Sequence, residues 1–171
     1  MNYNIMLIGF MGTGKTTVSR KLSETMNIKE VDMDAYIVEH EGRSINDIFK
    51  DDGEETFRNI ETACLVEIQK TTGKIVSCGG GAVLKDENVE LMKQNGKIVL
   101  LTAKPETVYK RVKNSKDRPI LNGNMNVEFI SELMAKRDSR YHEVADIIIA
   151  TDDKSPDEIC SEIKINLDKM V

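Results

Sequence analysis

Short apolar segments alternate along the chain with segments in which apolar residues recur every three or four positions. Strands are predicted at 5–8, 74–77, 98–101 and 147–149, with a further short strand ending near Val31. Nearly continuous apolar runs of this length are typical of parallel strands that are buried on both faces. A helix is predicted from about Gly14 to Met26, because Val18, Leu22 and Met26 are four residues apart.

Capping residues mark where other helices begin. Ser44 with Asp47 fits a capping box, and apolar residues at helical spacing continue from there to position 68. These helices are expected to lie beside the sheet. Pro105 begins another helix, and Ser155 with Glu158 forms a capping box at the start of the last one.

The order of elements predicts an α/β fold, formed by a single three-layer domain over residues 1–171. A five-stranded parallel sheet is expected to be flanked by helices. A polar segment at about 112–125 interrupts this order, with Pro119 and Gly123 and no apolar period. Such a segment between two helices is a candidate for a mobile lid loop.

Composition narrows the classes of protein that this chain can be. It has 171 residues, 40% of them hydrophobic, which argues against disorder. No apolar run approaches the roughly 20 residues that a membrane-spanning helix needs, and the start does not resemble a signal peptide, so a cytoplasmic protein is expected. The net charge of −5 argues against nucleic acid or membrane surfaces as partners. The three cysteines lack disulfide or zinc spacing and are expected to be reduced and buried.

The strongest motif lies between the first strand and the first helix. Residues 9–16, GFMGTGKT, fit the phosphate-binding pattern G-x-x-x-x-G-K-[ST] at every fixed position. Glycines allow backbone N–H groups to surround phosphate oxygens, and the helix adds its positive end. Lys15 is expected to bridge the β- and γ-phosphates of ATP, while the Thr16 hydroxyl binds Mg²⁺ directly. The remaining ATP-binding candidates are Gly12, Thr13, Gly14 and Thr17. A chance glycine turn is the competing interpretation, which both flanking elements oppose.

A carboxylate near the metal is also required, and the second strand is followed by Asp32 and Asp34. Asp32 is predicted to hold Mg²⁺ through water, and Asp34, two residues further on, is suited to face a second ligand. Taken alone, both acids would be explained as residues at the positive end of the next helix. The phosphate-binding loop makes the functional interpretation the better one.

Several separated motifs together resemble the shikimate kinases. They are GFMGTGKT, Asp32-x-Asp34, Phe57-Arg58-x-x-Glu61, Gly79-Gly80-Gly81, Arg118-Pro119 and Arg137-x-x-x-Tyr141, which cover nearly the whole chain in the family's order. The resemblance implies ATP-dependent phosphorylation of shikimate at its 3-hydroxyl, a step in the synthesis of aromatic amino-acid precursors. It also implies a helical substrate-binding region at about 33–60.

The resemblance assigns roles around the substrate. Asp34 is implied to bind the substrate hydroxyls and to orient or deprotonate the attacking one, while Arg58 and Arg137 hold the carboxylate. Glu61 lies three residues beyond Arg58 and is suited to orient it. The glycines at 79–81 are implied to bind substrate, the middle one through its N–H. Alone, these residues would be explained as an exposed ion pair, a solvated arginine and a left-handed turn.

Two more arginines are implied at the nucleotide. Arg118 resembles the lid arginine that reaches the phosphates, so that Lys15, Asp34 and Arg118 form the catalytic set. Arg111 and residues 151–156 match positions that lie by the adenine. With Arg58 and Arg137, four of the seven arginines fall at ligand positions in an acidic chain.

Two rival functions remain open at this point. A gluconate or nucleoside-monophosphate kinase would share the architecture, although a nucleotide acceptor needs more arginines for its second phosphate. A non-catalytic module that binds ATP to regulate a partner would be expected to lack Lys15, Thr16 or the lid arginine, and all are present. The expected partners are therefore the small molecules ATP and shikimate, with a monomeric protein.

Overall fold

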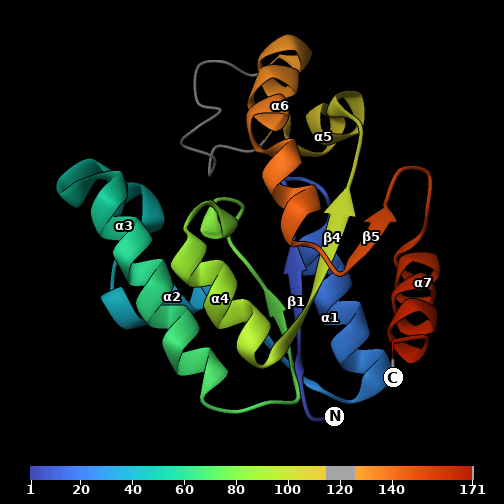
Figure 1. The fold of residues 1–171 in the computed structure, drawn as a ribbon. Coiled ribbons are helices and arrows are strands. Elements are labelled where there is room, and N and C mark those ends of the chain that lie inside the picture. The colour runs from blue at the N-terminus through green and yellow to red at the C-terminus, as the bar shows by residue number, and fades with distance from the viewer. Residues whose placement is uncertain (115–125, 171) are drawn as a thin grey trace.

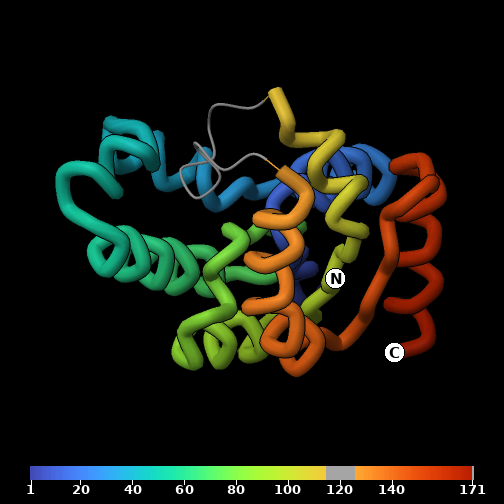
Figure 2. The backbone as a smooth tube through the Cα atoms, turned by 90° about the horizontal axis from the view of Figure 1, so that it is seen from above, coloured from blue at the N-terminus to red at the C-terminus, as the bar shows by residue number. Residues whose placement is uncertain are grey.

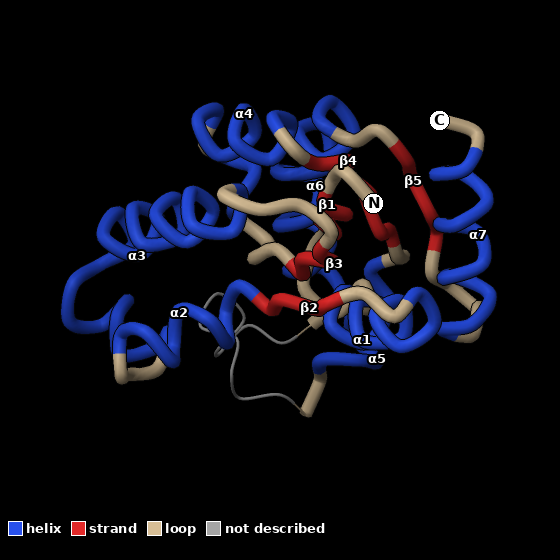
Figure 3. Tube along the Cα trace, turned by 90° about the horizontal axis from the view of Figure 1, so that it is seen from below, coloured by secondary structure: helices blue, strands red, loops and turns tan. Residues whose placement is uncertain are grey.

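A computed structural model describes residues 1–114 and 126–170, and five parallel strands form its sheet. Their order is β2-β3-β1-β4-β5. The strands are β1 (Asn4–Ile8), β2 (Lys29–Asp32), β3 (Lys74–Ser77), β4 (Gly96–Thr102) and β5 (Ile147–Ala150). The predicted α/β fold with a five-stranded parallel sheet is confirmed, and Figure 3 shows the strands crossing the middle of the molecule.

Helices cover both faces of this sheet and form the outer two of three layers (Figure 1). They are α1 (Lys15–Met26), α2 (Met33–Glu41), α3 (Ile45–Gln69), α4 (Asp86–Gln94), α5 (Pro105–Val112), α6 (Val127–Val144) and α7 (Pro156–Asp168), with a short 3₁₀ helix η1 (Ala82–Leu84). Figures 1 and 2 show α3 and α7 on opposite sides of the molecule. This arrangement agrees with the expectation that the helical region beginning near residue 33 stands beside the sheet.

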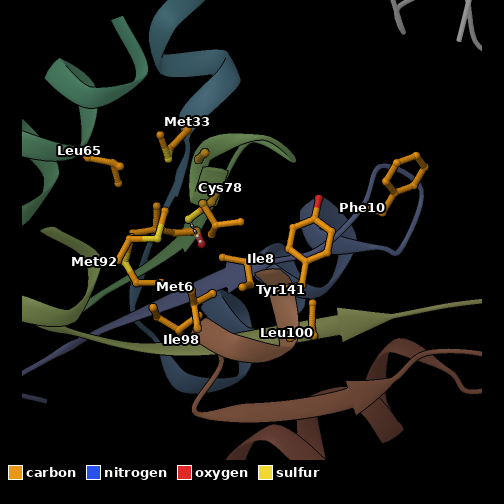
Figure 4. Close-up of a cluster of buried hydrophobic side chains, with 14 of the residues drawn as sticks. Met6, Ile8, Phe10, Met33, Leu65, Cys78, Met92, Ile98, Leu100 and Tyr141 are labelled. Carbon is orange, nitrogen blue, oxygen red and sulfur yellow. Dashed lines mark hydrogen bonds between the residues drawn. The ribbon is translucent and has the colours of Figure 1, made fainter. Parts of the chain in front are cut away.

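Strand β1 explains why the apolar runs are continuous. It pairs with β3 on one side and with β4 on the other, so its backbone is fully enclosed within the sheet. Ile5 and Leu7 belong to a core cluster shared with α1 and α7. Met6 and Ile8 point to the opposite cluster, which the helices α2 to α6 complete (Figure 4). Because neither face of the strand is exposed to water, its residues do not alternate between apolar and polar.

The helix boundaries largely follow the capping signals. Ser155 and Glu158 make both hydrogen bonds of a capping box before α7. Ser44 accepts from the backbone N–H of Asp47, which is one of the two bonds of that motif. Within α3, Gly53 has φ 85°, so the element consists of two helical pieces joined at a kink. Helix α4 and η1 were not predicted, and residues 115–125 of the expected lid lie outside the described part of the chain.

Parallel strands bring their carboxyl ends to one edge of the sheet, where ligands bind in open α/β folds. The phosphate-binding loop follows β1, Asp32 ends β2, and the three glycines follow β3 soon after its last residue. Strand β2 is one residue longer than predicted, so Asp32 is both its last residue and the N-cap of α2. Within the described residues, no helix is long and apolar enough to cross a membrane.

Candidate active site

A pocket of about 400 Å³ opens at the carboxyl edge of the sheet. It collects residues from the loop after β1, from α2, α3, α5 and α6, and from the glycine segment after β3. The lining residues that the sequence predicted are Gly12, Gly14, Lys15, Thr16, Thr17, Asp32, Asp34, Arg58, Gly79, Gly80, Gly81, Arg111 and Arg137. One cavity therefore brings together motifs that are spread over more than a hundred positions of the sequence.

The backbone of the loop at 9–16 requires glycine at three positions. Gly9, Gly12 and Gly14 have φ values of 146°, 75° and 100°, which side-chain-bearing residues rarely adopt. A β-carbon on Gly9 would also lie less than 3.0 Å from Leu101 O, and one on Gly12 would lie 2.8 Å from the Val112 side chain. The loop is consequently a tight backbone turn in which these three positions require glycine.

Lys15 lies across the concave side of this loop. Its Nζ donates to the carbonyl oxygens of Gly9 at 2.8 Å and Phe10 at 3.0 Å. The side chain of Thr13 is buried, and its hydroxyl donates to the same carbonyl oxygen, Phe10 O, at 2.7 Å. Thr13 therefore does not line the pocket, unlike the other predicted residues of the loop.

Two residues form hydrogen bonds that hold the loop after β1 in place: Arg111 from α5 and Thr151 directly after β5. The Arg111 guanidinium donates to Gly12 O at 3.0 Å and to the Thr151 hydroxyl at 3.2 Å. That hydroxyl in turn donates to Thr13 O at 3.0 Å. Thr151 is buried, so within the segment 151–156 this residue supports the loop from behind.

Asp32 makes the helix-capping bond that one interpretation predicted, and it also contacts Thr16. Its Oδ1 accepts from the Ala35 N–H at 3.1 Å and caps α2, while its Oδ2 accepts from the Thr16 hydroxyl at 3.3 Å. A hydroxyl beside a carboxylate oxygen is the hard-oxygen chemistry that Mg²⁺ prefers. Asp34 lies in the first turn of α2 and lines the same pocket.

Arg58 and Glu61 form the ion pair that their spacing predicted. Arg58 Nη1 donates to Glu61 Oε1 at 2.6 Å, and Nη2 donates to Glu54 at 3.2 Å. The side chains of Arg58 and Glu61 are only 13% and 1% exposed, so the alternative of an exposed pair is wrong. Burial raises the pKa of Glu61 above its ordinary value, although Arg58 opposes the shift.

The glycines at 79–81 do not form a left-handed turn, because none has a positive φ. Space explains two of them. A β-carbon on Gly79 would lie less than 3.0 Å from Glu61 Oε2, and one on Gly81 would lie 2.6 Å from Arg58 Cζ. Gly80 is different: the nearest atom to its β-carbon would be 3.6 Å away, an ordinary contact.

Helix α6 brings Arg137 to the pocket. Its guanidinium carbon lies 6.0 Å from the centre of the Phe10 ring, and a β-carbon on Gly80 would lie 3.6 Å from its Nη1. Arg137 is thus a pocket residue and not one solvated charge among several. One turn further along, the buried Tyr141 donates its hydroxyl to Gly80 O at 2.5 Å. This bond ties α6 to the glycine segment.

Sequence reasoning missed an apolar wall of the pocket. Phe49 and Phe57 face each other from the two pieces of α3, with ring centres 4.8 Å apart, and Ile45 and Cys78 also line the cavity. Their helical spacing predicted core positions, which is confirmed, because Phe57 is buried in the core cluster and Phe49 packs against it; both side chains also line the pocket. Tyr141 was noticed as part of a motif but received no role.

The charges of the pocket fall into two groups. Lys15 and Arg111 lie at the loop after β1, whereas Arg58 and Arg137 lie near the glycine segment with Asp34 and Glu61. The first group suits a polyphosphate. The second suits an anion that also carries hydroxyl groups, because guanidinium forks bind carboxylates and a carboxylate accepts from hydroxyls. The arrangement fits phosphoryl transfer from a nucleotide to a small hydroxy acid.

Comparisons with known proteins agree with this arrangement. A family model described as shikimate kinase matches residues 11–168. The chain is 40% identical to a shikimate kinase of Dehalococcoides mccartyi over 97% of this chain and 94% of that protein. It is 43% identical to one of a Sulfurihydrogenibium species, over 94% and 95% of the two chains. A solved shikimate kinase from Acinetobacter baumannii in complex with shikimate superposes with a TM-score of 0.92, 34% identity and coverage of 98% and 94%.

Proposed function

This chain belongs to the shikimate kinase family, and on that premise we propose that its pocket transfers the γ-phosphoryl group of ATP to the 3-hydroxyl of shikimate. The products are 3-phosphoshikimate and ADP, in the route to chorismate and the aromatic amino acids. One observation carries the proposal: a phosphate-binding loop shares a cavity with Asp34 and two arginines suited to a carboxylate.

The nucleotide is proposed to bind at the loop after β1. Backbone N–H groups of Gly12, Thr13 and Gly14 face the phosphates, followed by Thr16 and Thr17 at the positive end of α1. Thr13 can contribute only its backbone N–H, because its side chain is buried; that N–H, which donates to Phe10 O at 3.3 Å in the structure, would turn to a phosphate oxygen. Lys15 exchanges its two carbonyl acceptors for β- and γ-phosphate oxygens.

Thr16 and Asp32 are proposed to hold Mg²⁺, the first directly and the second through water. Their mutual hydrogen bond places a hydroxyl and a carboxylate where both can serve one cation. When bound, Mg²⁺ supplies positive charge at the β- and γ-phosphate oxygens. The chain's own contribution is to keep Asp32 fixed, which its bond to the Ala35 N–H provides.

Shikimate is proposed to bind in the region at about 33–60 and beside the glycine segment. Arg58 and Arg137 hold the carboxylate, and the Gly80 N–H contributes to binding between Gly79 and Gly81. Asp34 accepts a hydrogen bond from the attacking hydroxyl and orients it, or takes its proton, during transfer. The ion pair with Glu61 supports the role of Arg58 at the carboxylate, because it fixes the Arg58 guanidinium before the substrate binds.

Two further contacts complete the proposed site. Arg111 is proposed to pack by the adenine, and its hydrogen bond to Gly12 O, which keeps its guanidinium at the phosphate loop, supports this role. Arg118, in the proposed lid at about 112–125, lies outside the described residues, and its role at the transferring phosphate is proposed from the family resemblance. An arginine acting in this way contributes about 10³–10⁵ in rate.

A panel of acceptors tests the function. Purified protein with Mg²⁺ and ATP is expected to release ADP with shikimate, and not with gluconate or a nucleoside monophosphate. Arg137→Lys is expected to raise the KM for shikimate because a lysine cannot make the bidentate contact. Arg20→Lys, an arginine on the exposed face of α1, is the matched control and should behave as wild type. ADP release with another acceptor alone would overturn the proposal.

The rival functions lack a comparable observation. A gluconokinase from Sinorhizobium meliloti has 15% identity and a TM-score of 0.59, which shows a shared fold alone. A non-catalytic ATP-binding module has no use for a second set of paired arginines beside Asp34. If that module were the function, the acceptor panel would give no ADP release above background with any compound.

A further inference from the structure

We propose that Gly79 and Gly81 are positioning residues whose lack of a side chain leaves the space in which the Arg58–Glu61 ion pair lies. The inference rests on the proposed function: the two outer glycines determine where the substrate carboxylate is held. They act through Arg58 and Glu61, while the middle glycine faces the substrate itself.

The backbone of this segment does not need glycine. Gly79, Gly80 and Gly81 all have φ values outside the left-handed region, so alanine could adopt the same conformation without strain. A requirement for glycine must therefore come from what surrounds each residue. In this respect the segment differs from the loop after β1, where positive φ values alone already demand glycine.

The ion pair lies closest to the two outer glycines, and Asp34 Oδ1 would also lie 3.4 Å from a β-carbon on Gly79. A β-carbon on Gly79 would approach Glu61 Oε2 within 3.0 Å, a contact that β-carbons do not make. The carboxylate cannot easily move aside, because its side chain is 1% exposed and its Oε1 is bonded to Arg58. A β-carbon on Gly81 would lie 2.5 Å from Arg58 Nη1 and 2.6 Å from Cζ.

The middle glycine provides an internal contrast. A β-carbon on Gly80 would meet Arg137 Nη1 and Gly9 O at 3.6 Å and the Tyr141 hydroxyl at 3.8 Å, all ordinary contacts. A methyl group at Gly80 therefore fits the protein without substrate. At the other two positions the same addition would overlap the ends of the Glu61 and Arg58 side chains, so the ion pair would have to shift.

A double-mutant cycle tests the idea. Gly79→Ala is expected to raise the KM for shikimate at least tenfold, with the KM for ATP within twofold of wild type. In a Glu61→Ala background the same substitution should change the KM for shikimate less than twofold, because the atom that it meets most closely is gone. A penalty of equal size in both backgrounds would overturn the proposal, since it would mean that Gly79 acts on Asp34, on the substrate or on the backbone instead of on the ion pair.

A second readout needs no substrate and so separates this proposal from the proposed function. Gly79→Ala and Gly81→Ala are expected to lower the melting temperature of the ligand-free protein, whereas Gly80→Ala should not. Glu61→Ala/Gly79→Ala should melt as Glu61→Ala does, even if Gly79→Ala alone does not fold. Equal destabilisation by alanine at all three positions, or no recovery in the double variant, would contradict the proposal.

Discussion

Replacing Glu61 by glutamine separates what this residue does for folding from what it does for binding. Glutamine has nearly the same volume, so no cavity forms where the buried carboxylate lies. It removes the negative charge that attracts Arg58 at 2.6 Å. The substitution therefore changes the electrostatics of the pair and leaves its packing almost intact.

The expected effect on binding follows from the strength of that bond. Hydrogen bonds between charged groups contribute about 1.5–3 kcal/mol. If the Arg58 fork loses this orientation, affinity for the substrate carboxylate falls by about 10- to 100-fold, since about 1.4 kcal/mol corresponds to a factor of ten. The KM for ATP should stay within twofold, because Lys15 bonds to the loop after β1 whereas Glu61 lies beside the glycine segment.

The expected effect on stability is small and depends on pH. Burial raises the pKa of Glu61, so the folded protein binds this proton more tightly than the unfolded chain does. Between the pKa of Glu61 in the unfolded chain and its higher pKa in the folded protein, the unfolding free energy of the wild type falls as the pH rises. Glutamine does not titrate, so Glu61→Gln does not show this fall. Arg58 keeps its second partner, Glu54, which limits the cost of removing the first.

Steady-state kinetics and denaturant unfolding measure these effects together. We expect a raised KM for shikimate, and an unfolding free energy that improves relative to wild type as the pH rises from about 4, near an ordinary glutamate pKa, through the raised pKa of folded Glu61. An unchanged KM for shikimate would refute the reasoning, because it would show that Arg58 does not depend on Glu61 for its orientation.

Three further outcomes are expected. Tyr141→Phe removes the hydroxyl bonded to Gly80 O and should raise the KM for shikimate several-fold with the KM for ATP unchanged; equal effects on both would contradict this role. Arg111→Ala frees Gly12 O and should weaken ATP binding, measured by calorimetry, more than shikimate binding. The three cysteines are buried, and burial raises the pKa of the Cys64 thiol to about 12. A thiol reagent should therefore label the native protein slowly and the unfolded protein at all three cysteines. Fast labelling of the native protein would refute this.

The sequence predicted those features that depend on neighbours along the chain. The apolar run at β1, the loop at 9–16 and the capping box at Ser155 each contain their own explanation within a few residues. The spacing of Arg58 and Glu61 likewise predicted their contact on one helix face. The predicted reduced and buried state of the cysteines is also confirmed.

Other features arise from contacts between distant segments and left no local signal. Arg111 bonds to Gly12, 99 residues away, so its hold on the phosphate loop was not visible in either motif. Gly79 looked like a flexible turn because glycine is most often explained by its backbone. Glycine is needed at position 79 because Glu61 occupies the space that a side chain would fill, and only the folded structure shows this contact.

A crystal structure of the protein with ADP, Mg²⁺ and shikimate tests the central claim most directly. The substrate carboxylate is expected between Arg58 and Arg137, with the 3-hydroxyl oxygen about 2.6–3.2 Å from the Asp34 carboxylate and facing the phosphate loop. Shikimate bound with its carboxylate away from both arginines, or with another group at Asp34, would contradict the account.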